Sequence, residues 1–200
     1  IAGAWLWWRT RSAVRVNYAL AVIAVAALIW FPTGTMRNAL LPITAAGWDL
    51  PTPRITSTIV AVREGVMETV TYLERRLTTQ PVSYTMLTNA YSMSTTKEAS
   101  RRYMKLFAYW PLAVHPDPDR SQQALLIAFG VGNTAKALTD AEAFSSIDVV
   151  DPSRDILQMS RTVFPNGGNP LDDPRVRVHV EDGRYFLQTT DERFDLITGE

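Results

Sequence analysis

Cysteine is absent from the 200 residues of the chain, and histidine occurs only twice, as His115 and His179. The lack of cysteine excludes disulfide bonds, thiolate metal sites and a cysteine nucleophile, and two histidines are too few for a histidine-rich metal centre. Neither sign of charge is in excess, because 20 basic side chains balance 20 acidic ones. We therefore expect no metal ion, and no nucleic acid partner attracted by a basic surface.

Charge is also missing from a long segment near the N-terminus. No charged residue occurs between Val16 and Met36, and Trp30 lies near the end of this segment. Residues 1–8 are apolar as well, and three arginines lie between the two stretches. Membrane-spanning helices need about 20 apolar residues, and tryptophan favours the membrane interface. We predict transmembrane segments with a basic loop over residues 1–36, a location at the cell membrane and a soluble domain in the cytoplasm; a buried helix or a signal sequence is the alternative.

A small β unit is predicted after a linker at residues 37–54, which are rich in proline, glycine and threonine. Residues 55–120 contain three runs that are typical of strands, followed by the amphipathic pattern of a helix. The predicted strands are Ile55–Val62, Val66–Leu73 and Val82–Leu87, and the helix is Lys97–Trp110, ended by Pro111.

Strands and helices alternate over residues 121–200. The predicted strands are short apolar runs, as in a parallel sheet that helices cover on both faces. They lie at 124–129, 147–150, 176–180 and 194–198, with helices at 134–140, 153–164 and 183–190. The fold class is therefore α/β, with a Rossmann-like domain after the β unit. The chain begins at Ile1 and ends at Glu200, at a strand end, so we expect a fragment whose domain is truncated after the fourth strand.

Each predicted strand ends in residues suited to a nucleoside, which in open parallel sheets binds beyond the carboxyl ends of the strands. Gly130 and Gly132 leave room for a ligand beside the next helix N-terminus. Asp151 could accept hydrogen bonds from ribose hydroxyls, and Asp182, followed by Gly183, could accept one from an adenine amine. Glu200 follows the fourth strand.

Other interpretations of these residues stay open. Asp151 and Asp182 could simply cap the helices that follow them. The pattern Gly130-x-Gly132-x-x-Ala135 also fits the dinucleotide fingerprint, which keeps a nicotinamide-dependent oxidoreductase as an alternative. An acid followed by glycine after the third strand favours an S-adenosyl type of nucleoside instead.

Four stretches together resemble the spermidine synthase (polyamine aminopropyltransferase) family, especially bacterial versions fused to membrane segments. They read ALLIAFGVGNTAKAL, IDVVDPSRDIL, NPLDDPRVRVHVEDGRYFL and FDLITGE. VAVREGVMETVTYLER is similar to the family's N-terminal β segment. The resemblance covers about residues 55–200, and its fold is of the S-adenosylmethionine-dependent methyltransferase type.

The resemblance implies a membrane-attached transferase that moves an aminopropyl group from decarboxylated S-adenosylmethionine to an amine. The glycine loop with Gly130, Gly132 and Asn133 would then hold the thionucleoside, Asp151 the ribose, and Asp182 with Gly183 the adenine. Glu200 would remove a proton from the attacking amine. The expected partners are a small-molecule amine substrate and the membrane, with a homodimer left open.

The sequence also departs from the family's pattern. Asn133 stands where the family's glycine loop carries an aspartate, and Ser92, Lys105 and Tyr109 replace its usual glutamine, glutamate and histidine. Lys105 has the wrong charge to meet an ammonium group. Three alternatives therefore stay open: a methyltransferase that uses intact S-adenosylmethionine, a nicotinamide-dependent oxidoreductase, and a non-catalytic nucleoside-binding membrane protein.

Overall fold

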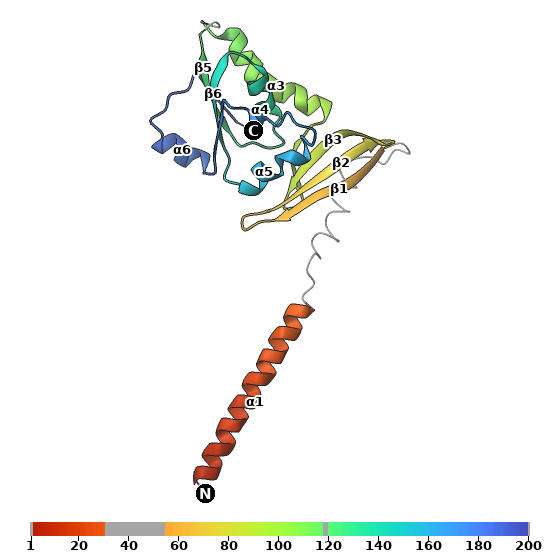
Figure 1. The fold of residues 1–200 in the computed structure, drawn as a ribbon, viewed down its shortest axis with the longest axis vertical. Coiled ribbons are helices and arrows are strands. Elements are labelled where there is room, and N and C mark those ends of the chain that lie inside the picture. The colour runs from red at the N-terminus through yellow and green to blue at the C-terminus, as the bar shows by residue number, and fades with distance from the viewer. Residues whose placement is uncertain (1, 31–54, 118–119, 200) are drawn as a thin grey trace. The chain divides into compact units, whose positions relative to one another are not determined.

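The computed structural model describes residues 2–30, 55–117 and 120–199 (Figure 1). The chain divides into two compact units, residues 1–42 and 43–200, each of which is described by itself. In the first unit, α1 (Ala2–Ile29) is one continuous helix. The arginines that we assigned to a loop between two segments therefore lie within this helix.

No helix in the described ranges is long and apolar enough to cross a membrane. The predicted location at the cell membrane is therefore wrong, and the predicted transmembrane segments have no support. The physical reason lies in α1, where the uncharged part runs only from Val16 to Ile29, well short of the roughly 20 residues that a bilayer requires. Residues 31–36 and the predicted linker at 37–54 lie outside the described residues.

The second unit begins with an antiparallel sheet in the order β1-β2-β3-β4. Its strands are β1 (Ile55–Glu64), β2 (Thr69–Leu77), β3 (Gln80–Thr88) and β4 (Tyr91–Thr95). β2 begins three residues later than predicted, because the Gly65 N–H bonds to the Glu68 carbonyl at 2.8 Å and closes a turn. β4 was not predicted, since its five residues, three of them serine or threonine, carry little strand signal. Asn89 and Ala90 join it to β3 with φ angles of 51° and 67°, as in a hairpin turn of type I′.

A parallel sheet follows, in the order β7-β6-β5-β8. Its strands are β5 (Gln122–Ile127), β6 (Phe144–Val150), β7 (Val176–His179) and β8 (Leu196–Gly199). All three strand pairs are parallel, with β8 beside β5. The predicted α/β class is confirmed.

The helices lie close to the predicted positions, with two clear differences: the helix predicted at 153–164 ends at Met159, and the predicted helix end at Pro111 is not found. They are α3 (Glu98–Val114), α4 (Asn133–Asp140), α5 (Arg154–Met159) and α6 (Gly183–Thr189), with short 3₁₀ turns at Ser160–Thr162 and Pro170–Asp172. Pro111 lies inside α3 and does not end it. A proline this near the helix end removes one N–H donor while the remaining residues complete the last turn. The His115 N–H then bonds to the Leu112 carbonyl at 3.3 Å.

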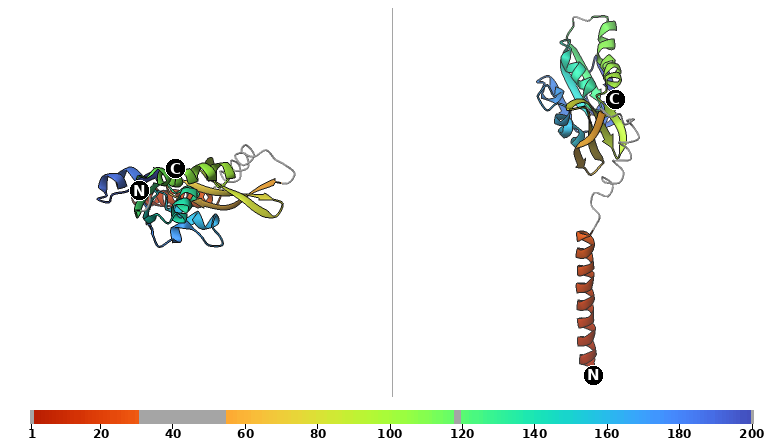
Figure 2. Two further views of the ribbon diagram at one scale, coloured as in Figure 1. Left: turned by 90° about the horizontal axis from the view of Figure 1, so that it is seen from above. Right: turned by 90° about the vertical axis from the view of Figure 1, so that its right-hand side faces the viewer.

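The helices cover both faces of the parallel sheet. In Figures 1 and 2, α3 and α4 lie on one side of this sheet and α6 on the other. The larger core cluster joins the first side to residues of the antiparallel sheet, including Val70, Tyr72 and Met86, so the two sheets share one core. Phe186 of α6 packs with Leu125 and Val150 on the second side.

Candidate nucleoside site at the carboxyl edge of the parallel sheet

The carboxyl ends of the four parallel strands meet in one row. Ile127 pairs with Val150 on one side and with Gly199 on the other, and Val150 pairs with His179. Backbone bonds extend the row by one step, from the Ala128 N–H to the Val150 carbonyl at 2.8 Å and from the Asp151 N–H to the His179 carbonyl at 3.0 Å. The segments that follow the strands are thus held side by side, where this fold class binds nucleotides.

Two glycines approach Ile127 closely at this edge. A Cβ on Gly183 would lie 2.4 Å from the Ile127 Cγ2, and a Cβ on Gly199 would lie 3.0 Å from the Ile127 carbonyl oxygen. Both positions therefore require glycine or a shift of the neighbouring chain. Ile127 therefore packs directly against both glycines and occupies the space that a side chain at either position would need.

The glycine turn after β5 has a packing role of its own. Gly130 and Gly132 adopt φ angles of 57° and 84°, and both are buried. A Cβ on Gly132 would lie 2.7 Å from the Phe129 ring and 3.1 Å from the Phe164 ring. We predicted that Gly132 leaves room for a ligand; in the structure, two aromatic rings of the chain itself occupy that side.

Asn133 is turned into the protein. Its side chain is 5% exposed, and its Nδ2 donates to the Thr95 carbonyl and lies near the Met104 Sδ, each at 3.0 Å. These contacts fasten the start of α4 to β4 and α3. The side chain of Asn133 therefore points away from the carboxyl edge where we expected it to meet a nucleoside.

Asp151 combines a capping role with spare acceptor capacity. Its Oδ2 accepts from the Phe129 N–H and its Oδ1 from the Ser153 N–H, both at 2.8 Å. Burial raises the pKa of this carboxyl; the two backbone donors oppose the change, and the negative charge of Glu68 adds to it. A carboxylate has about four acceptor positions, so two remain for ligand hydroxyls.

Asp182 is exposed and caps α6. Its Oδ1 accepts from the N–H groups of Arg184 at 2.9 Å and Tyr185 at 3.1 Å, so the capping alternative holds for this residue. Its Oδ2 makes no hydrogen bond within the described part of the chain and faces solvent. Glu200, predicted as the catalytic residue, lies outside the described residues.

Besides Asn133, the departures from the family's pattern lie on β4 and α3. Ser92 is half-buried on β4, and Tyr109 is 37% exposed on α3. Lys105 is half-buried on α3 and lines a separate cavity. Ile127 and Phe129 are residues of the edge that the sequence analysis missed. Nothing in their residue type distinguishes them from other apolar core positions.

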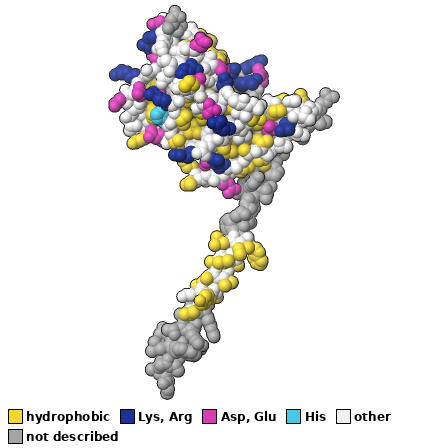
Figure 3. Space-filling view, in the orientation of Figure 1, with side chains coloured by type: hydrophobic (Ala, Val, Ile, Leu, Met, Phe, Trp, Pro, Cys, Tyr) yellow, Lys and Arg dark blue, Asp and Glu magenta, His cyan; other side chains and the backbone are white. Residues whose placement is uncertain are grey.

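Charges of both signs are interspersed over the second unit. Figure 3 shows Lys and Arg side chains next to Asp and Glu side chains over the visible face, without a large area of one sign. This agrees with the even charge balance of the sequence. Long-range steering therefore favours neither a cationic nor an anionic ligand, so recognition must come from individual contacts.

The fold is that of a Rossmann-like α/β protein, and comparison with known proteins narrows this class. Residues 100–200 match the spermine/spermidine synthase domain. The polyamine aminopropyltransferase of Streptococcus pneumoniae is 33% identical over 98 residues, which cover 49% of this chain and 33% of the relative. That of Clostridium perfringens is 31% identical over 105 residues, covering 52% and 36%.

Solved structures show the same fold. The spermidine synthase of Thermotoga maritima superposes with a TM-score of 0.60 at 16% identity, over 71% of this chain and 46% of that one. A spermidine synthase in complex with the transition-state analogue AdoDATO gives the same TM-score and identity, over 71% and 47%. The chain belongs to the spermine/spermidine synthase family. It spans about a third of the length of the curated relatives it matches.

Proposed function

We propose that this chain takes part in aminopropyl transfer from decarboxylated S-adenosylmethionine to a small amine, with the nucleoside held at the carboxyl edge of the parallel sheet. The observation that carries the proposal is the row of four parallel strand ends, two of which are followed by the acidic side chains of Asp151 and Asp182. Family membership supports the same reaction, because the matching relatives are named as polyamine aminopropyltransferases.

The residues at the edge fit an adenine nucleoside. Gly183 and Gly199 let the backbone come close to Ile127, and we propose that this apolar side chain packs against the flat face of a purine. Asp182 keeps one carboxylate oxygen free for the adenine amine, and Asp151 keeps acceptor positions for the ribose hydroxyls. Charge-assisted hydrogen bonds of this kind contribute about 1.5–3 kcal/mol each.

The chemistry requires little from the protein beyond orientation and a base. The nitrogen of the acceptor amine attacks the aminopropyl carbon that is bonded to the sulfonium; the C–N bond forms as the C–S bond breaks. The electron pair of the C–S bond moves to sulfur, which leaves as the neutral thioether of methylthioadenosine. The amine nitrogen must lose one proton, and we propose that Glu200 accepts it. Alignment and a positioned base are effective means of catalysis for such a displacement.

Calorimetric titration tests the nucleoside part of the proposal. We expect methylthioadenosine and decarboxylated S-adenosylmethionine to bind, and Asp182→Asn to weaken both by about ten-fold. Asparagine is itself a good N-cap, so the variant removes the charge and keeps α6 capped. Asp172→Asn is the matched control, because Asp172 precedes β7, at the opposite end of this strand from Asp182.

The same titration separates the alternatives. Tighter binding of intact S-adenosylmethionine than of the decarboxylated compound would favour a methyltransferase. Binding of a nicotinamide dinucleotide with no binding of methylthioadenosine would overturn the proposal. The role of Glu200 has its own test: Glu200→Gln should leave nucleoside affinity nearly unchanged and reduce aminopropyl transfer by about 10²–10⁴. Full transfer activity would remove the residue from the mechanism.

A further inference from the structure

A second cavity lies on the flank of α4, away from the carboxyl edge. It has a volume of about 370 Å³, within the range that small organic ligands occupy. Its walls come from β3, from α3, from α4 and from the segment after the 3₁₀ turn at Ser160–Thr162. Of the residues predicted for the nucleoside it includes only Asn133, and it extends to Asp140 at the far end of α4.

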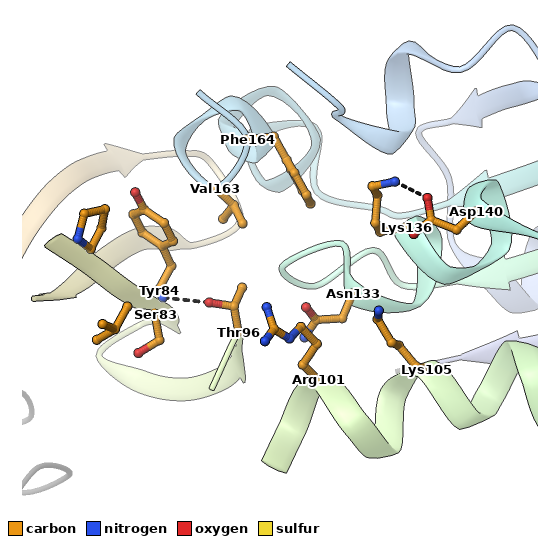
Figure 4. Close-up of a pocket in the computed structure, with 12 residues that line it drawn as sticks. Ser83, Tyr84, Thr96, Arg101, Lys105, Asn133, Lys136, Asp140, Val163 and Phe164 are labelled. Atoms are coloured by element: carbon orange, nitrogen blue, oxygen red, sulfur yellow. Dashed lines mark hydrogen bonds and ion pairs between the residues drawn. The ribbon is translucent and has the colours of Figure 1, made fainter. Parts of the chain in front are cut away.

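Cations dominate the polar lining of this cavity. Arg101 and Lys105 rise from α3 on one side, and Lys136 lies across from them on α4 (Figure 4). Asp140 is the single carboxylate among the lining residues. It pairs with Lys136, while Arg101 bonds to Glu98 at 2.7 Å.

Lys105 differs from these neighbours because no acidic partner holds it. It is half-buried, and no ion pair joins it to any residue in the described part of the chain. A half-buried ammonium has lost part of its hydration, so it gains more than a fully exposed one from an anion that enters the cavity. The sign of this lining also excludes the amine acceptor of the proposed reaction as the occupant.

The opposite wall of the cavity is apolar. Val163 and Phe164 project toward it from the side facing α3, as Figure 4 shows, and Tyr84 closes one end. Phe164 is held in place, since its ring lies against Gly132 at the start of α4. A ligand there would meet a positive charge on one side and an aromatic ring on the other.

We propose that this cavity binds a small organic anion, with its carboxylate or phosphate group at Lys105 and Arg101 and its apolar body against Val163 and Phe164. The site shares Asn133 with the residues predicted for the nucleoside but contains neither Asp151 nor Asp182, so this proposal does not depend on the proposed transferase function. An occupant would touch α3, α4 and β3 at once. It would therefore stabilise the packing of the antiparallel sheet against the parallel one.

Calorimetry with simple probes tests this site on the intact chain. We expect phenyl phosphate or benzoate to bind, inorganic phosphate to bind about ten-fold more weakly because it lacks the apolar body, and putrescine not to bind. Comparison of the first two probes shows which anionic group the cavity prefers. Binding of putrescine in place of the anions would overturn the proposal.

Two charge-matched variants assign the binding to the cavity. Lys105→Met should weaken phenyl phosphate about ten-fold or more, and Lys105→Arg should restore most of the affinity. Arg102→Met is the control, because it also removes one positive charge from α3. Arg102 is exposed, pairs with Glu98 as Arg101 does, and does not line the cavity. The melting temperature of each variant shows whether it is folded. Equal affinity in folded Lys105→Met and Arg102→Met would reject the site, as would unchanged methylthioadenosine binding combined with no anion binding.

Discussion

The two four-stranded sheets of the second unit differ in how they are buried. In the parallel sheet, β5 and β6 are covered on both faces, and Leu125, Leu126 and Val149 are fully buried. In the antiparallel sheet, this holds only for the first half of β2 and for Met86 and Leu87 of β3, while Val82 on β3 is 52% exposed. The difference indicates that burial of the parallel sheet contributes most of the stability. The antiparallel sheet contributes mainly through those of its residues that pack into the common core.

The largest expected effect tests this contrast directly. Leu126→Ala should lower the free energy of unfolding by about 3–5 kcal/mol, because it leaves a cavity in a fully covered strand. Leu77→Ala, at the 45% exposed end of β2, should change it by less than about 0.5 kcal/mol. Urea denaturation measures both. Similar losses in the two variants would show that the sheets are equally important.

A slightly smaller effect is expected at the junction between the sheets. Gly132→Val should lower the free energy of unfolding by about 2–4 kcal/mol. A branched side chain would clash with Phe129, and it would also be strained at the positive φ angle of this residue. Thermal unfolding measures the loss. A folded variant of normal stability that fails to bind methylthioadenosine would instead support our first interpretation, that this glycine faces the ligand.

Arg175 fastens the loop before β7 to the segment between α4 and β6. It donates to the carbonyl groups of Ala141 at 3.1 Å and Phe144 at 2.9 Å, to the Thr139 carbonyl, and to Asp173. Arg175→Met should cost about 2–3 kcal/mol at neutral pH, since these buried acceptors lose a charged donor. Equilibrium unfolding in urea gives the value.

The same variant has a pH signature. Arg175 holds the pKa of Asp173 below its usual value, so the stability from this pair is present above the unfolded pKa and is lost as pH falls through the folded one. As the pH falls from about 5 to about 2, the free energy of unfolding of the wild type should therefore decrease more than that of Arg175→Met. Parallel pH profiles of the two proteins would contradict this assignment.

Asp151→Asn sharpens the comparison at the carboxyl edge. The two carboxylate oxygens of Asp151 accept from two backbone N–H groups, and an asparagine would present its amide NH₂ to one of them. We therefore expect the free energy of unfolding to fall by about 1–2 kcal/mol. Burial raises the pKa of Asp151 in the folded state above its value in the unfolded chain. The stability that follows from this shift is therefore fully present below the unfolded-state pKa, and it is lost as the pH rises through the folded-state pKa. The variant should lack this titration, which unfolding measured from acid to neutral pH would detect.

The smallest effect concerns two alanines with positive φ, one in each region. Ala128 follows β5 with φ 68°, and Ala90 lies in the β3–β4 turn with φ 67°. Glycine has no penalty there, so Ala128→Gly and Ala90→Gly should each raise stability by about 0.5–1 kcal/mol. Differential scanning calorimetry can resolve the change. A loss in either variant would mean that packing of the methyl group outweighs the backbone strain.

The sequence by itself indicated the α/β class, the approximate positions of the four parallel strands and the family. Short apolar strands, the glycine turn and acids after the second and third strands are local signals, because each reports the backbone geometry or the burial of its own segment. The same signals placed Asp151 and Asp182 at the correct strand ends. Local signals also misled: an apolar stretch in α1 suggested membrane spans, and Pro111 suggested a helix end that the structure does not have.

Only the tertiary structure decided what the side chains at these positions face. It turned Asn133 toward β4 and α3, and it placed Phe129 and Phe164 against Gly132. It also brought Lys105 of α3 to the same cavity as Lys136 of α4, although nothing in either segment marks the pairing. The orientation of a side chain depends on neighbours that are distant in sequence, so no pattern within one segment can specify it.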